Sequence, residues 1–241
     1  MNKLLTNGVK AAHDIVQKAL SQKRFELLET EAKELIGIFG ITTTKHVVAS
    51  SVTDAVKAAT TIGYPVVLKV VSPDISHKTD VGGVKVGIHD DAGVRVAYEE
   101  IIKSVKTRLP DARIHGILVE EMARASTEVI VGGLRDPQFG PAVMFGLGGI
   151  FVEVFKDVSF RIAPIEEHEA LDMINEVKGS RLLKGFRNTE ASDISTLAQT
   201  IMQVSDMMVS IEEIKEIDLN PVIVYPQGVK AVDARIIIRR L

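Results

Sequence analysis

The segment KVVSPDISHKTDVGGVKVGI, residues 69–88, places two apolar runs on either side of a polar stretch that ends in paired glycines. The first run belongs to YPVVLKVV (64–71), where Pro65 stands at the start, the position at which a missing N–H does least harm to a strand. The second run, GVKVGI (83–88), suits an antiparallel partner. We therefore expect a hairpin whose long connecting loop carries His77.

Helices and strands alternate around this hairpin. Apolar residues at helical spacing predict helices in the first 40 residues, at 55–62, from about 94 to a stop at Pro110, and at about 166–178 and 192–210. Further strands are predicted at 45–50, 113–121, 126–134 and 141–150, with two or three more between 213 and 238. Because tight turns join several neighbouring strands, we expect an α+β fold with two antiparallel sheets, each covered on one side by helices.

Composition narrows the classes of function. The 241 residues can bury the core of one large domain or of two small ones. The net charge of −3 gives no broad attraction to nucleic acid or to a membrane. Since the chain has no cysteine, disulfides, thiolate zinc sites, iron–sulfur clusters and cysteine nucleophiles are excluded. With neither a signal peptide nor 18 consecutive apolar residues, a cytoplasmic protein is expected.

Lys69 interrupts the apolar run VVLKVV. A lysine inside a buried strand is costly unless a carboxylate pairs with it or its ammonium reaches a bound anion. Alternatively, the side chain lies at a strand end and extends into water. The glycine pair that follows 13 residues later favours the interpretation in which the Lys69 ammonium reaches a bound anion.

The loop SPDISHKTDVGG is a candidate phosphate site. Gly82 and Gly83 allow the backbone to approach an oligophosphate and offer N–H donors. Hairpin turns also use glycines, so this alternative stays open. The chain has no GxxxxGK[ST] motif, and GLGGIF (146–151) departs from GxGxxG at Phe151. The usual P-loop and Rossmann phosphate sites are therefore absent.

Acidic and amide side chains gather near the C-terminus, in IDLNP and AVDAR. On a strand, Asp218 and Asn220 face the same side, and Asp233 can lie opposite them on the next strand. Two carboxylates and an amide oxygen suit Mg²⁺, which prefers oxygen ligands and keeps several waters. A polar sheet edge is the alternative interpretation.

Two further glutamates, Glu120 and Glu128, flank the connection VEEMARASTEV. Such a linker can present a backbone N–H to an adenine ring while a glutamate binds the ribose hydroxyls. Two solvated acids beside a turn fit the same spacing equally well.

Three segments, residues 63–88, 119–164 and 216–236, together resemble a known family. They are similar, in this order, to the ATP-grasp domain of the NDP-forming acyl-CoA synthetases, which include ADP-forming acetyl-CoA synthetases and are related to succinyl-CoA synthetase. The resemblance covers roughly residues 23–240. It implies an ATP-grasp fold with nucleotide bound between two subdomains, roughly 45–118 and 119–241, with 23–44 packing on the second and 1–22 as an additional helix.

The resemblance also implies a role for each matching residue. His77 matches a histidine implicated in the family as a second phosphoryl carrier, and Lys69 matches a strand lysine that contacts nucleotide phosphates. Further nucleotide-binding positions are implied at Lys78, Gly82, Gly83, Glu120, Glu121, Glu128, Glu153 and Arg161. The implied Mg²⁺ ligands are Asn220 and Asp233, with Asp218 beside them.

The implied enzyme is an acid–thiol ligase that catalyses acyl-CoA + ADP + phosphate ⇌ acid + CoA + ATP through a phosphohistidine. Because the further flavodoxin-like domain of the succinyl-CoA synthetase β chain is missing here, we expect an α subunit with the CoA-binding and ligase domains, in an α₂β₂ heterotetramer. Two alternatives remain. A stand-alone ATP-grasp carboxylate ligase acting through an acyl phosphate would be active without a partner, whereas a nucleotide-sensing regulatory subunit would bind MgATP without turnover.

Overall fold

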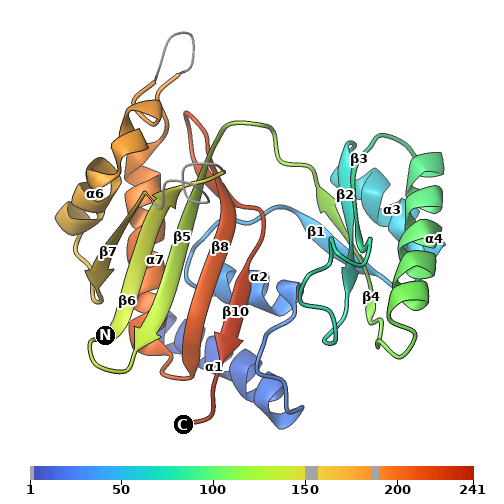
Figure 1. Cartoon of the computed structure of the whole chain (residues 1–241), viewed down its shortest axis with the longest axis horizontal. Coiled ribbons are helices and arrows are strands. Elements are labelled where there is room, and N and C mark those ends of the chain that lie inside the picture. Colours follow the sequence, from blue (N-terminus) through green and yellow to red (C-terminus); the bar gives the residue numbers. More distant parts are fainter. Residues whose placement is uncertain (1–2, 150–156, 186–189) are drawn as a thin grey trace. The chain divides into compact units, whose positions relative to one another are not determined.

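The computed structural model describes residues 3–149, 157–185 and 190–241, which form two compact units (Figure 1). The small unit is Thr44–Arg124, and the large unit combines Met1–Thr43 with Ala125–Leu241. The chain thus leaves the large unit once, builds the small unit, and returns.

The small unit is a four-stranded antiparallel sheet in the order β1-β4-β2-β3, covered on one face by two helices. Val66, Leu68 and Val70 alternate along β2 and are fully buried in the core shared with the helices. Ser51 and Asp90 cap the two helices by accepting backbone N–H groups with their side chains. The elements are β1 (His46–Ala49), α3 (Val52–Ile62), β2 (Val66–Val71), β3 (Val84–Ile88), α4 (Asp91–Arg108) and β4 (Gly116–Glu121).

The large unit is a six-stranded antiparallel sheet in the order β10-β8-β5-β6-β7, with β9 paired to β8. Its strands are β5 (Thr127–Asp136), β6 (Gly140–Leu147), β7 (Val158–Ile162), β8 (Ile214–Val224), β9 (Val229–Ala231) and β10 (Arg235–Ile238). Its helices are α1 (Lys3–Ser21), α2 (Glu29–Ile38), α6 (Glu167–Glu176) and α7 (Ile194–Ser210), with a 3₁₀ turn at Lys178–Leu182.

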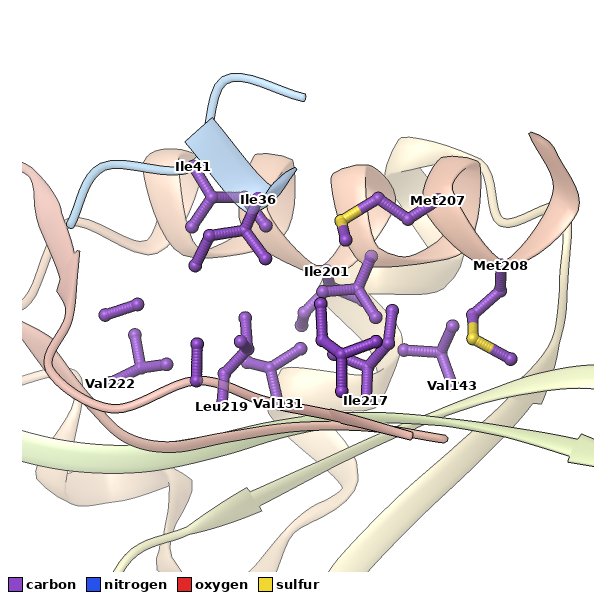
Figure 2. Close-up of a cluster of buried hydrophobic side chains, with 14 of the residues drawn as sticks. Ile36, Ile41, Val131, Val143, Ile201, Met207, Met208, Ile217, Leu219 and Val222 are labelled. Atoms are coloured by element: carbon purple, nitrogen blue, oxygen red, sulfur yellow. The ribbon is translucent and has the colours of Figure 1, made fainter. Parts of the chain in front are cut away.

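The helices of the large unit pack on one face of this sheet (Figure 1). Figure 2 shows Ile201 and Met208 of α7 pointing toward Val131, Val143 and Ile217 of the strands. Among the described residues of the large unit, no helix covers the opposite face, which we call the open face. None of the described helices combines the length and apolar content needed to cross a bilayer.

The predicted α+β fold with two antiparallel sheets, each covered by helices on one face, is confirmed. Some boundaries differ. The strand predicted at 113–121 begins at Gly116, because both the side chain and the N–H of Arg113 bind Asp74 of the hairpin loop instead. Strand β7 was not predicted, since its polar residues Ser159 and Arg161 leave only a short apolar pattern at a sheet edge.

Phe145 lies at the centre of the large unit and is completely buried. We expect Phe145→Ala to lower the free energy of unfolding of this unit by about 3–5 kcal/mol, because it leaves a cavity. Phe139→Ala, at a side chain that is 68% exposed, should change it by less than about 0.5 kcal/mol. Urea unfolding followed by circular dichroism measures both, and equal effects of the two substitutions would contradict the assignment of this core.

Candidate functional site

Lys69 lies in the middle of β2 and is paired with Glu120 of β4. Val67 is opposite Glu120 and Lys69 is opposite Leu118, so Lys69 and Glu120 are diagonal neighbours on the sheet face away from α3 and α4. The Lys69 Nζ lies 2.9 Å from the Glu120 Oε2, and the two side chains are only 9% and 1% exposed. Lys69 therefore does not extend into water from a strand end.

Thr44 completes this cluster, because its hydroxyl donates a hydrogen bond to the Glu120 Oε1. Thr44 is itself buried and lies two residues before the start of β1. One carboxylate thus accepts both an ammonium and a hydroxyl, which fixes the position of the Lys69 side chain. We refer to Thr44, Lys69 and Glu120 as the lysine cluster.

This arrangement changes the expectation for the linker around Glu120. The Glu120 carboxylate is bound inside the lysine cluster, so it serves Lys69 rather than standing free for a ribose. The backbone N–H groups of Glu121 and Met122 donate to the carbonyls of Lys45 and Pro65. These two amides stabilise the sheet, and a ligand at this strand end would have to use other groups.

The hairpin loop is tied down on both sides of His77. Asp74 forms an ion pair with Arg113 at 2.6 Å, and this guanidinium holds the pKa of Asp74 at about 2. On the other side, the Ser104 hydroxyl donates to the Val81 carbonyl at 2.9 Å. His77 is exposed between these two anchors, so an external group can reach its ring.

The glycine pair has a structural role in the loop. Gly82 adopts a φ of 68°, and a Cβ there would lie 2.5 Å from the Ser104 hydroxyl oxygen. The N–H groups of Gly82 and Gly83 donate to the carbonyls of Thr79 and Lys78 at 3.0 and 2.7 Å. In this conformation both amides stabilise the loop itself, so the expectation that they are phosphate donors requires the loop to rearrange.

In the large unit, Asp218 and Asn220 lie on the open face of β8, while Ile217 and Leu219 point into the core. Both polar residues line a cavity of about 520 Å³, whose remaining walls come largely from β5 and β6. The predicted common orientation of Asp218 and Asn220 is confirmed by this alternation.

Asp218 is surrounded by negative charge. Burial raises its pKa, and the nearby carboxylates of Glu216 and Asp233 raise it further, while Arg235 opposes the shift. Such a site gains from a bound cation, which would neutralise the carboxylates. Among the described residues, no three His, Cys, Asp or Glu side chains gather to hold a metal. Two carboxylates and an amide nevertheless fit Mg²⁺, which takes its remaining ligands from water and bound phosphate.

Arg235 was not anticipated from the sequence. Arg235 of β10 lies opposite Asp218 of β8, the position expected for Asp233, which instead lies in the connection between β9 and β10. The Arg235 guanidinium contacts Glu26 at 3.1 Å and Glu216 at 3.7 Å. The sequence feature that could have pointed to Arg235 is its position two residues after Asp233 in AVDAR. Thr44 carried no signal, because it lies 76 residues from Glu120.

The remaining predicted residues are more scattered. Glu128 is exposed at the start of β5, and its carbonyl accepts the Gly148 N–H. Arg161 is opposite Val143 of the core, and its guanidinium binds Glu176 of α6 at 3.0 Å. It therefore lies on the helix-covered face and is not brought together with Asp218 and Asn220. Lys78 is half-buried in the loop, and Glu153 lies outside the described residues.

Comparisons with known proteins place this geometry in context. A family model described as an ATP-grasp domain matches residues 18–238. The β subunit of acetate–CoA ligase [ADP-forming] I of Pyrococcus furiosus is 47% identical, over 95% of this chain and 99% of the relative. Acetate–CoA ligase [ADP-forming] I of Archaeoglobus fulgidus is 44% identical over 94% of this chain, which spans only 33% of that longer protein.

Solved structures of a similar protein have the same fold as this chain. The dinucleotide forming acetyl-coenzyme A synthetase 1 of Ca. Korarchaeum cryptofilum, in complex with coenzyme A and Ca-AMPCP, has a TM-score of 0.92 and 53% identity over 95% of this chain and all of that chain. A second structure of that protein, with a TM-score of 0.83 and 49% identity over the same shares, contains Mg-AMPPCP and a phosphohistidine segment pointing towards the nucleotide binding site.

The lysine cluster yields a stability prediction. Glu120→Gln should lower the free energy of unfolding by about 3–5 kcal/mol, because it leaves the buried Lys69 ammonium without its counter-ion. Glu100→Gln, in the exposed pair with Lys85, should cost less than about 1 kcal/mol. Urea unfolding measures both, and a Glu120→Gln protein as stable as the Glu100→Gln control would show that the pair is not buried as described.

Asp218 yields a prediction of pH dependence. Because its folded pKa lies above the ordinary 3.8, ionising Asp218 lowers the stability of the folded state as pH rises through that folded pKa. In metal-free buffer, Asp218→Asn should therefore raise the melting temperature at pH 7, and the gain should shrink as the pH falls toward 4. Asp111→Asn, at an exposed position, serves as control. A gain that grows on acidification would contradict the assigned environment.

Proposed function

Because the chain belongs to the ATP-grasp family, in the group of the β subunits of ADP-forming acetate–CoA ligases, we propose that it is the nucleotide-binding β subunit of an ADP-forming acyl-CoA synthetase. The reaction is acyl-CoA + ADP + phosphate ⇌ acid + CoA + ATP. The observation that carries the proposal is the buried lysine cluster: Lys69 is held inside a sheet by one carboxylate, as a phosphate-binding cation requires.

Phosphoryl transfer depends mainly on alignment and on neutralising the charge of the phosphates. Lys69 supplies a fixed positive charge, since Glu120 and Thr44 hold its side chain in one place. Asn220 and Asp233, with Asp218 beside them, would hold Mg²⁺. When bound, the metal would supply positive charge that neutralises the phosphates during transfer. The Korarchaeum relative has been solved with Mg-AMPPCP, in keeping with a nucleotide that binds together with a divalent metal.

His77 is the proposed phosphoryl carrier. A neutral imidazole nitrogen can attack the γ-phosphorus of ATP without a separate base. The new N–P bond forms as the bond between that phosphorus and the bridging oxygen breaks, and ADP leaves with the electron pair. The exposed position of His77 between two loop anchors allows the phosphorylated ring to meet a second acceptor.

That acceptor belongs to a partner. The names of the Pyrococcus relatives as β subunits imply a separate α subunit. The Archaeoglobus relative, in which the matching part is a third of one polypeptide, supports the same division of parts. We propose that the α subunit carries the CoA-binding and ligase domains and assembles with this chain as α₂β₂.

The test is ATP-dependent labelling of the complex of this chain with its α subunit. With γ-labelled MgATP, we expect acid-labile, base-stable label on the wild-type chain and at least a tenfold loss of this label in His77→Ala, since His77 is the one histidine in the sequence of the loop from 72 to 83. His89→Ala, at another exposed histidine, should label like the wild type. Full labelling and full synthetase activity of His77→Ala would overturn the relay. Acyl-CoA synthesis by the isolated chain would instead indicate a stand-alone ligase.

A further inference from the structure

The loop that carries His77 is held at its N-terminal side through Asp74. The Asp74 Oδ2 accepts the backbone N–H of Arg113 at 2.8 Å and its Nε at 2.9 Å, while Oδ1 accepts Nη2 at 2.6 Å. A forked contact of this kind fixes the orientation of the two groups as well as their separation. The Asp74 backbone is fixed too, because its N–H donates to the hydroxyl of the buried Ser72 at 3.1 Å. We call the pair of Asp74 and Arg113 the loop clamp.

Arg113 is attached to the framework of the small unit on both of its sides. Ahead of it, the Ala112 N–H donates to the Leu109 carbonyl in the turn that follows α4. After it, the His115 N–H donates to the Val71 carbonyl at 2.8 Å, at the end of β2. The position of Arg113 is therefore set by α4 and by the sheet, and not by the loop that it holds.

The loop clamp limits which part of the loop can move. Ile75 directly follows Asp74 and is buried in the core of the small unit. On the other side of the loop, the Val81 carbonyl accepts the Ser104 hydroxyl at 2.9 Å. His77 is exposed between these points, two residues after Ile75 and three after Asp74. Because this connection is short, a displacement of Asp74 would be passed on to the His77 ring.

Stability alone does not account for the loop clamp. The side chains of Arg113 and Asp74 are 68% and 32% exposed, and an exposed ion pair contributes little to the free energy of unfolding. Its three hydrogen bonds do determine where the loop leaves the sheet. A reacting group needs such control, since a displacement of about 1 Å can slow its reaction by about a hundredfold.

We propose that Arg113 is a positioning residue for phosphoryl transfer to His77. Acting through Asp74, it holds the loop so that the imidazole nitrogen meets the γ-phosphorus of ATP, where the N–P bond forms as the bond from phosphorus to the ADP oxygen breaks. The inference rests on the proposed function. Arg113 acts through Asp74 and not as a charge on the nucleotide, because its Nε and Nη2 both donate to that carboxylate.

The experiment measures how fast His77 is phosphorylated in the complex of the full-length chain with its α subunit. Arg113→Ala, Asp74→Ala and the double variant are mixed with saturating γ-labelled MgATP, and acid-labile, base-stable label is followed by rapid quench. We expect each single substitution to slow labelling by about tenfold or more. The double substitution should slow it no further than the slower single one, because both remove the same contact. Lys85→Ala, which breaks the exposed pair with Glu100 in the same unit, should label at the wild-type rate.

Two further measurements separate positioning from a general structural role. The affinity for MgATP, measured by calorimetry, and the stability to urea should match the wild type in every variant, so that only the rate of labelling changes. A loss of MgATP affinity or of stability that matches the loss of rate would assign the pair to nucleotide binding or to folding, and would overturn the inference.

A wild-type rate of labelling in Arg113→Ala would also overturn it. So would slow labelling in Arg113→Ala together with a wild-type rate in Asp74→Ala, because Arg113 would then act directly on the phosphates. An unlabelled wild-type complex is a different result, since it would refute the proposed function and the inference with it.

Discussion

The buried ion pair between Lys69 and Glu120 is the interaction on which the rest of the small unit depends. Two opposite charges are tolerated inside this sheet only because the ions lie 2.9 Å apart and the Thr44 hydroxyl donates to the second carboxylate oxygen. The pairing register of β2 with β4 creates this diagonal contact, and the segment leading into β1 delivers Thr44 to it. A fixed lysine is the result, on the sheet face that no helix of this unit covers.

The large unit presents the opposite electrostatic situation. Asp218 lies beside Glu216 and Asp233, so its carboxylate is destabilised until a cation is present. The small unit therefore carries a cation with its own counter-ion, whereas the large unit carries carboxylates that favour a metal. Under the proposed function, the lysine would neutralise nucleotide phosphates and the carboxylates would hold the accompanying Mg²⁺. Family membership and this chemistry lead to the same conclusion by separate routes.

Much of the fold could be predicted, because alternation along strands records which side is buried. The hairpin of 64–71 with 83–88 and the common orientation of Asp218 and Asn220 both followed from this period of two. The contacts that the sequence did not reveal are ones that no residue pattern records, whether they join distant segments or lie within one loop. No pattern could show that Thr44 binds Glu120, or that Gly82 and Gly83 use their amides inside the loop. Without β7, the sequence also could not show that Arg161 faces α6.

The most direct measurement is the affinity of the full-length chain for MgATP and for adenosine, compared between the wild type and Lys69→Gln by titration calorimetry. If Lys69 neutralises nucleotide phosphates, MgATP affinity should fall by about tenfold or more while adenosine affinity stays the same, which also shows that the variant is folded. An unchanged MgATP affinity in Lys69→Gln would contradict the account, because the buried lysine would then serve only the stability of its sheet.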